Sequence, residues 1–179
     1  MLKAVVTLSL EGLVEDLASQ NPVIRQEARR KLTVMGRPVI GRLRPLLKSP
    51  SEQVRWEAAK TMADIGGPDS ANALAETLSD SSRDVRWVAT EGLIASHSDA
   101  LEPMLHELIT RSSLVWVREA GIRVLDAAIR EEHNHFLRPV MKALKDRAPI
   151  FGVPIAAYEA LVTIQRNRLR LDSHHATGA

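Results

Sequence analysis

The stretch Ser82-Arg-Asp-Val-Arg-Trp-Val-Ala-Thr-Glu-Gly-Leu93 decides the fold, because the chain repeats it. A near copy, Ser51-Glu-Gln-Val-Arg-Trp-Glu-Ala-Ala-Lys-Thr-Met62, stands upstream, and weaker copies begin at Pro22, Trp116 and Val153. The arginines of the first four copies fall at positions 25, 55, 86 and 118, at spacings of 30, 31 and 32 residues. A constant period of this length is typical of solenoids, in which each repeat buries its apolar face against its neighbours.

Each copy reads as the second helix of a helix pair. If Val85 points inward, a rotation of about 100° per residue turns Ala89 and Leu93 inward with it and directs Trp87, Thr90 and Glu91 outward. In the second copy the same arithmetic turns Val54, Ala58 and Met62 inward and Trp56, Ala59 and Lys60 outward. The sequence therefore predicts an all-α fold, an α-α superhelix of about five antiparallel helix pairs.

Helix ends are marked by residues that stop or cap helices. Asn21-Pro22 predicts an N-cap followed by a proline at the first helical position, and Gly36 and Gly66 predict C-caps. Prolines recur inside the first helix of three pairs, which predicts a bend there; they are Pro45, Pro103 and Pro139. Pro154 replaces the arginine in the fifth copy and is expected in the first turn of a final helix that ends near Arg168.

These boundaries predict one domain, a repeat array over residues 1–170, followed by a flexible tail over residues 171–179. The first helix and the weak fifth copy are expected to cap the two ends with polar surfaces. The oligomeric state does not follow from the sequence.

The repeat, an apolar helix with a proline, a short polar turn, then Val-Arg-x-x-Ala-x-x-x-Leu and a glycine, resembles the HEAT repeat in the short form also found in phycobilin lyase-like proteins. In that family an aspartate in the turn and an arginine early in the second helix bond along the stack. The resemblance assigns such a structural ladder to Arg25, Arg55, Asp80, Arg86 and Arg118. Ser19, Ser49 and Ser112 stand where the other aspartates would be, so the ladder is expected to be incomplete.

The resemblance also implies that the outer face of the second helices lines a concave groove, where Trp56 and Trp87 hold the same register. Exposed tryptophans anchor binding partners, although rings that fill the space between repeats would be structural instead. Trp116 lies in a longer turn and is expected in the core. The predicted partner-binding residues are Arg29, Arg30, Trp56, Lys60, Trp87, Glu91 and Arg123.

Charge is distributed unevenly although the formal net charge is only +2. Residues 21–48 carry a net charge of +7, residues 49–112 carry −6 and residues 113–179 carry +3. A groove that grades from basic through aromatic to acidic favours a mixed-charge protein or peptide as the partner. The leading hypothesis is a non-enzymatic, cytoplasmic adaptor or scaffold that needs no cofactor.

Two alternatives from other classes stay open. One is a phycobilin lyase-type enzyme subunit that handles a tetrapyrrole in the groove without a thiol, because the chain has no cysteine. The other is a nucleic-acid binder that uses the basic segment and the tryptophans, with Glu91 as the carboxylate that HEAT-like DNA glycosylases need.

Other chemistry finds little support in the sequence. His106-Glu107 is a single pair, whereas HEAT-type deoxyhypusine hydroxylases hold two irons with several such pairs, so no metal site is expected. No apolar run approaches the roughly 20 residues of a membrane helix, and a membrane partner is not expected.

Overall fold

The computed structural model describes the backbone of residues 9–130 and 134–176, with side chains up to residue 170. All regular structure in these segments is helical, which confirms the predicted all-α fold. The chain forms two compact units, residues 1–92 and residues 93–179.

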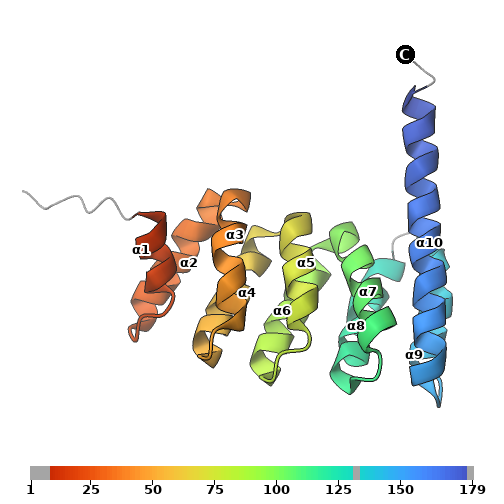
Figure 1. Cartoon of the computed structure of the whole chain (residues 1–179), viewed down its shortest axis with the longest axis horizontal. Coiled ribbons are helices and arrows are strands. Elements are labelled where there is room, and N and C mark those ends of the chain that lie inside the picture. Colours follow the sequence, from red (N-terminus) through yellow and green to blue (C-terminus); the bar gives the residue numbers. More distant parts are fainter. Residues whose placement is uncertain (1–8, 131–133, 177–179) are drawn as a thin grey trace, which may run out of the picture. The chain divides into compact units, whose positions relative to one another are not determined.

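The first unit contains α1 to α5 and most of α6 (Figure 1). Its elements are α1 (Leu10–Asp16), α2 (Pro22–Met35), the 3₁₀ turn η1 (Arg37–Val39), α3 (Ile40–Leu43), the 3₁₀ turn η2 (Arg44–Lys48), α4 (Glu52–Ile65), α5 (Gly67–Thr77) and α6 (Arg83–Ala95). α2 packs on both α1 and α4, and α4 packs on η2 and α5. The second helices α2 and α4 therefore lie beside each other, as stacked repeats require.

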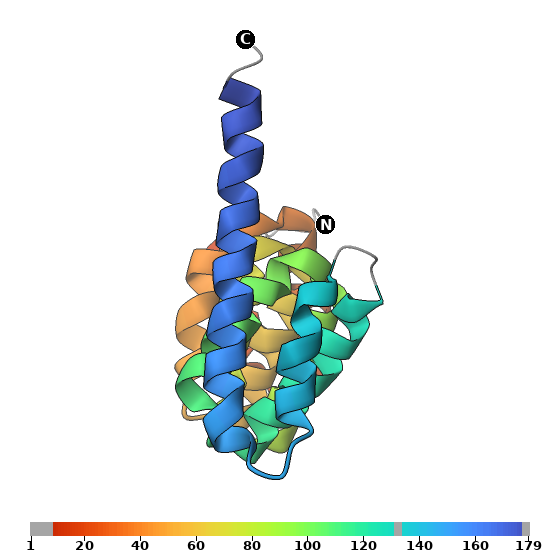
Figure 2. The same ribbon diagram turned by 90° about the vertical axis from the view of Figure 1, so that its right-hand side faces the viewer.

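The second unit consists of two further helix pairs. Its elements are the 3₁₀ turn η3 (His97–Ala100), α7 (Leu101–Arg111), α8 (Val115–Ile129), the 3₁₀ turn η4 (His135–Leu137), α9 (Arg138–Leu144) and α10 (Pro149–Ala176). α10 packs on α7 and α9, and α8 packs on the same two helices. In Figure 2, α10 lies beside α9 and projects well beyond it.

The predicted helix ends are confirmed in the first unit. The side chain of Asn21 accepts a hydrogen bond from the N–H of Val23, and Ser51 accepts one from the N–H of Val54. Gly36 and Gly66 end α2 and α4 with φ of 71° and 70°, a conformation that glycine adopts without steric strain.

The prolines lie where 3₁₀ and α geometry meet. η2 follows α3 and has Pro45 in its first turn, while Pro103 and Pro139 lie in the first turns of α7 and α9, directly after η3 and η4. Where a bend was predicted in the first helices, the structure has a change of helix type. Pro154 departs from the prediction: because α10 begins at Pro149, this proline lies in the second turn and removes a helical hydrogen bond.

α10 is also longer than the helix predicted to end near Arg168, since its backbone stays helical to Ala176.

The core is aliphatic and rich in alanine, and it includes the predicted inward residues Ala58, Met62, Ala89 and Leu93. Ala59 and Thr90 were predicted to point outward and are buried instead. α4, which carries Ala59, packs on α2, η2 and α5, so its buried arc is wider than a single stripe.

Trp116 is more exposed than the sequence predicts. It was expected in the core, yet it is 39% exposed near the start of α8.

Candidate functional site

The four register arginines share one contact, a clamp on the turn that precedes their own helix. Each donates from Nη1 to the backbone carbonyls six and five residues earlier. Arg25 binds Ser19 and Gln20 at 2.9 and 3.2 Å, Arg55 binds Ser49 and Pro50 at 2.9 and 3.3 Å, Arg86 binds Asp80 and Ser81 at 2.8 and 2.9 Å, and Arg118 binds Ser112 and, at 3.0 Å, Ser113. These carbonyls lie past a helix end, so the clamp supplies them with donors.

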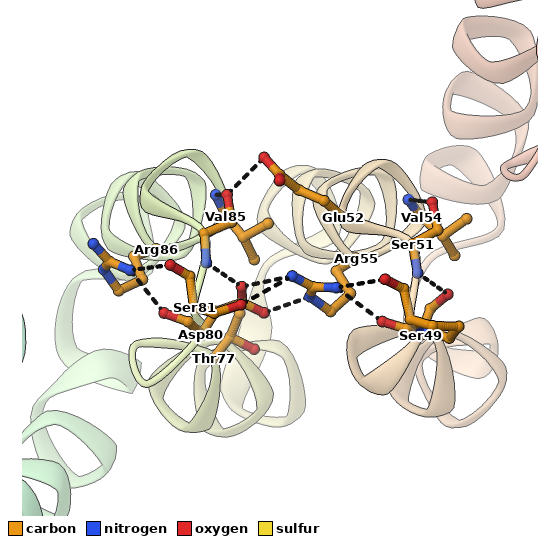
Figure 3. A network of polar contacts seen from close by, with 12 residues as sticks. Ser49, Ser51, Glu52, Val54, Arg55, Thr77, Asp80, Ser81, Val85 and Arg86 are labelled. Atoms are coloured by element: carbon orange, nitrogen blue, oxygen red, sulfur yellow. Dashed lines mark hydrogen bonds and ion pairs between the residues drawn. The ribbon is translucent and has the colours of Figure 1, made fainter.

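Asp80 links two successive repeats. Its carboxylate accepts hydrogen bonds from Nε and Nη2 of Arg55 at 2.7 and 3.0 Å, and also from the N–H of Ser82 at 2.7 Å. Figure 3 shows the Arg55 guanidinium between this carboxylate and the turn that contains Ser49. The hydrogen bonds from Arg55 to Asp80 raise the pKa of the arginine above its ordinary value.

Arg25 finds its carboxylate elsewhere. In the turn that follows α2 and η2, Ser49 occupies the position that Asp80 holds one repeat later. Its hydroxyl accepts a hydrogen bond from the N–H of Ser51 at 3.2 Å, as Asp80 does from Ser82, but it carries no charge. Glu57, in the middle of α4 and buried, takes that role: Oε1 accepts from Nε of Arg25 at 2.8 Å, and Oε2 accepts from Arg29.

Sequence reasoning did not single out Glu57. The available signal was its position in α4 between the inward-facing Val54 and Ala58, where an acid needs a partner.

Trp56 lies next to this ion-pair cluster. The guanidinium carbon of Arg29 is 5.5 Å from the centroid of the Trp56 ring, within the range of a cation–π contact. The ring is half-buried, and it borders an open hollow of about 420 Å³. The hollow is lined by Arg25, Glu52, Gln53, Trp56, Glu57 and Asp84.

Trp87 has a different setting. It is 56% exposed on α6, one turn after Asp84 of the hollow. Glu52 joins α4 to the start of α6, because its carboxylate accepts from the Ser82 hydroxyl at 2.8 Å. The exposed acids Glu52 and Asp84 therefore lie on the same surface as the two tryptophans.

The other predicted binding residues fall into two groups. Arg30 and Lys60 already have ion-pair partners on their own helices: Arg30 binds Glu27 at 2.9 and 3.0 Å, and Lys60 binds Asp64 at 2.6 Å. Hydrogen bonds from Arg30 and then Lys31 lower the pKa of Glu27 to about 2.

Glu91 is partly buried on α6, and Arg123 is exposed on α8 in the second unit.

The basic segment is extensively paired. Its arginines contact acids of the flanking elements: Arg37 binds Asp69 at 2.7 Å, Arg44 binds Glu76, and Arg42 approaches Glu11 at 3.7 Å. With Arg25, Arg29, Arg30 and Lys31 bound to glutamates, seven of its eight cations have a carboxylate partner on the described surface.

Neither a metal site nor a membrane-spanning helix is found among the described residues. Among the side chains of residues 9–130 and 134–170, no cluster of three histidines or acids has the geometry to hold a metal ion. Over the same residues, no helix combines the length and the apolar character that crossing a membrane requires.

The ladder, the helix pairing and the period point to one family. Residues 10–94 match the family model described as HEAT repeats. These residues belong to the HEAT-repeat family. The match includes the clamps of Arg25, Arg55 and Arg86 and the Asp80 bridge, whereas the Arg118 clamp lies beyond the matched residues. No curated protein matches the chain.

Proposed function

We propose that this HEAT-repeat protein is a non-enzymatic scaffold that binds a protein or peptide segment on the surface formed by α4 and α6, with Trp87 as the main apolar anchor. The observation that carries the proposal is the 56% exposure of Trp87 on a helix whose other large apolar side chains are mostly buried. Tryptophan is enriched among residues that dominate binding energy, because one ring removes a large apolar area from water.

The chemistry around Trp87 indicates what the partner offers. Glu52 and Asp84 are exposed, and the nearby arginines are held by Glu57. A partner segment with an apolar side chain for Trp87 and a lysine or arginine for the two acids suits this surface. The proposal includes a cytoplasmic location, which the lack of cysteine suits.

Pairing within the basic segment disfavours the nucleic-acid alternative. A phosphate backbone binds through basic side chains that exchange counterions for phosphate. Here most of the arginines would first have to leave carboxylates of the same unit. No observation on the described residues favours the tetrapyrrole alternative.

The test is capture of binding partners, or of peptides from a random library, by the wild-type chain, Trp87→Ala and Trp116→Ala. Trp116 is a matched control, since it is also exposed but lies on α8. We expect a ligand that the wild type and Trp116→Ala retain and that Trp87→Ala binds at least tenfold more weakly. Equal binding by all three proteins, or a ligand released by salt and competed by any polyanion, would contradict the proposal.

A further inference from the structure

The last helix carries two apolar faces. Its inner face, with Val153, Ala157 and Ala160, is buried against the rest of the second unit. On the opposite side of the helix, Phe151 is 78% exposed, Ile155 64%, Tyr158 61% and Leu169 69%. A helix that is apolar on two opposite faces is typical of the interior of a stack, where neighbours cover both sides.

The exposed side chains follow a heptad spacing. Beginning at Phe151, steps of four and three residues define an outer seam of Phe151, Ile155, Tyr158, Val162, Gln165 and Leu169. At 100° per residue all six lie within about 40° of one line along the helix. Five of the six are apolar, and such a seam is the pattern with which two helices pack along their length.

α10 also extends past the helices that support it. It has 28 residues, whereas α7 has 11 and α9 has 7. Residues 165–170 are all exposed, and Figure 2 shows this end of the helix projecting from the unit. Arg168 pairs with Glu102 on α7, but the exposed end of the helix has little apolar packing, so a covering helix would stabilise it.

We propose that the outer seam is a homodimer interface, in which α10 of a second copy packs antiparallel on α10 about a two-fold axis near residue 160. The alternation of four and three is the same in both directions, so the second copy presents an identical seam. This register places Phe151 of each copy against Leu169 of its partner and Tyr158 against Val162. In this register residues 165–170 of each helix lie opposite residues 150–155 of the other.

The exposed area fits a weak to moderate dimer. The four exposed apolar seam residues leave on the order of 500 Å² of apolar surface per copy, because a large apolar side chain of the aromatic class covers 150–250 Å² when fully buried. Two copies with their flanking residues would bury roughly 1,200 Å², which is the lower end of specific interfaces. An apolar surface of about 500 Å² lies in the range of the largest patch on a typical monomer, and such patches are often binding sites.

The first test is sedimentation of the full chain between about 1 and 200 µM, a range that brackets micromolar affinity. We expect the wild type to shift from monomer to dimer with concentration and Ile155→Glu to stay monomeric throughout. Val34→Glu is the matched control, because Val34 is 79% exposed on α2 in the first unit, and it should dimerise like the wild type. Melting curves at low concentration should coincide for all three.

A wild type that stays monomeric, an Ile155→Glu variant that still dimerises, or assembly that continues beyond the dimer would overturn the inference.

The second test fixes the orientation. The chain has no cysteine, so single cysteines can be introduced without background. In the antiparallel register Tyr158→Cys lies opposite Val162→Cys, and a mixture of the two variants should form a disulfide at least tenfold faster than either variant alone. Faster cross-linking of each variant with itself would instead show parallel helices and contradict the proposed register. Neither test depends on the proposed function, whose residues lie in the first unit.

Discussion

Two successive contacts between repeats in the first unit each use a carboxylate, but the two carboxylates come from different positions in the repeat. Between α4 and α6, Asp80 in the turn binds Arg55. Between α2 and α4 the turn has Ser49, and Glu57 inside α4 binds Arg25 and a second arginine, Arg29. Asp80 therefore makes both the hydrogen bond within the turn and the ion pair between repeats. In the preceding repeat these two interactions are made by different residues, Ser49 and Glu57.

This difference extends to the tryptophans. Arg29, recruited by Glu57, lies over the Trp56 ring. At the same register before Trp87 stands Ala59, which is buried and offers no cation. Trp56 is therefore packed against Arg29 of the preceding repeat, whereas Trp87 has no such cation beside it among the described residues and remains exposed.

The largest effect is expected for Glu57→Ala. It leaves two partly buried arginines without their carboxylate, and we expect the free energy of unfolding in urea to fall by about 3 kcal/mol. Adding Ser49→Asp places a carboxylate at the Asp80 register and should recover part of the loss. Equal loss in the single and double variants would show that the two registers are not equivalent. Glu27→Ala, at an exposed pair, is the control and should change little.

Gly92→Ala should disturb the packing of α6 against α4 and α5. A Cβ at position 92 would lie 2.7 Å from the Ala63 Cβ, 2.7 Å from Leu74 Cδ1 and 3.2 Å from the Ala63 Cα. Since backbone must move, we expect a loss of about 1–3 kcal/mol in chemical denaturation. Gly121→Ala meets mainly the end of the Leu108 side chain, at 2.9 Å, and should lose less. A larger loss for Gly121→Ala would contradict this reading of the contacts.

Trp56→Ala and Trp87→Ala should differ in stability. Trp56 is half-buried and contacts Arg29, so its removal should lower the free energy of unfolding by about 2 kcal/mol. Removal of the exposed Trp87 should lower it by less than about 1 kcal/mol. Arg29→Met, which keeps length without charge, should reproduce part of the Trp56→Ala loss and leave Trp87 unaffected. Equal losses for the two tryptophans would remove the distinction.

The smallest effect concerns Glu27, whose pKa of about 2 lies below its ordinary value because Arg30 and Lys31 donate to it. A carboxyl with a lowered pKa contributes stability above its ordinary pKa of 4.5, and the contribution disappears as the pH falls through about 2. Carboxyl carbon NMR should show this midpoint, and Arg30→Ala should move it upward. An ordinary midpoint in the wild type would mean that Arg30 is available to a partner.

Much of the fold could be predicted because it repeats. The arginine register, Asn21, Gly36 and Gly66 each specify a local structure, and four copies reinforce one another. Glu57 could not be assigned by the same route, because the family pattern places the acid in the turn, whereas here a carboxylate from another register reaches the arginine.

Burial was harder to predict at the faces between helices. Ala59 and Thr90 are covered by neighbours that a single-helix projection ignores, while Trp116 is exposed at the start of its helix. The outer seam of α10 was expected to be a polar cap because the fifth copy of the repeat is weak. Its apolar spacing is visible in the sequence only once both faces of one long helix are considered.

The most direct test measures binding and stability together in Trp87→Ala, with a ligand selected on the wild-type chain. The account predicts at least a tenfold rise in Kd with a change in unfolding free energy below about 1 kcal/mol, because the exposed ring contacts the partner and little else. An unchanged Kd, or a loss of several kcal/mol in stability, would show that Trp87 is a structural residue and would contradict the account.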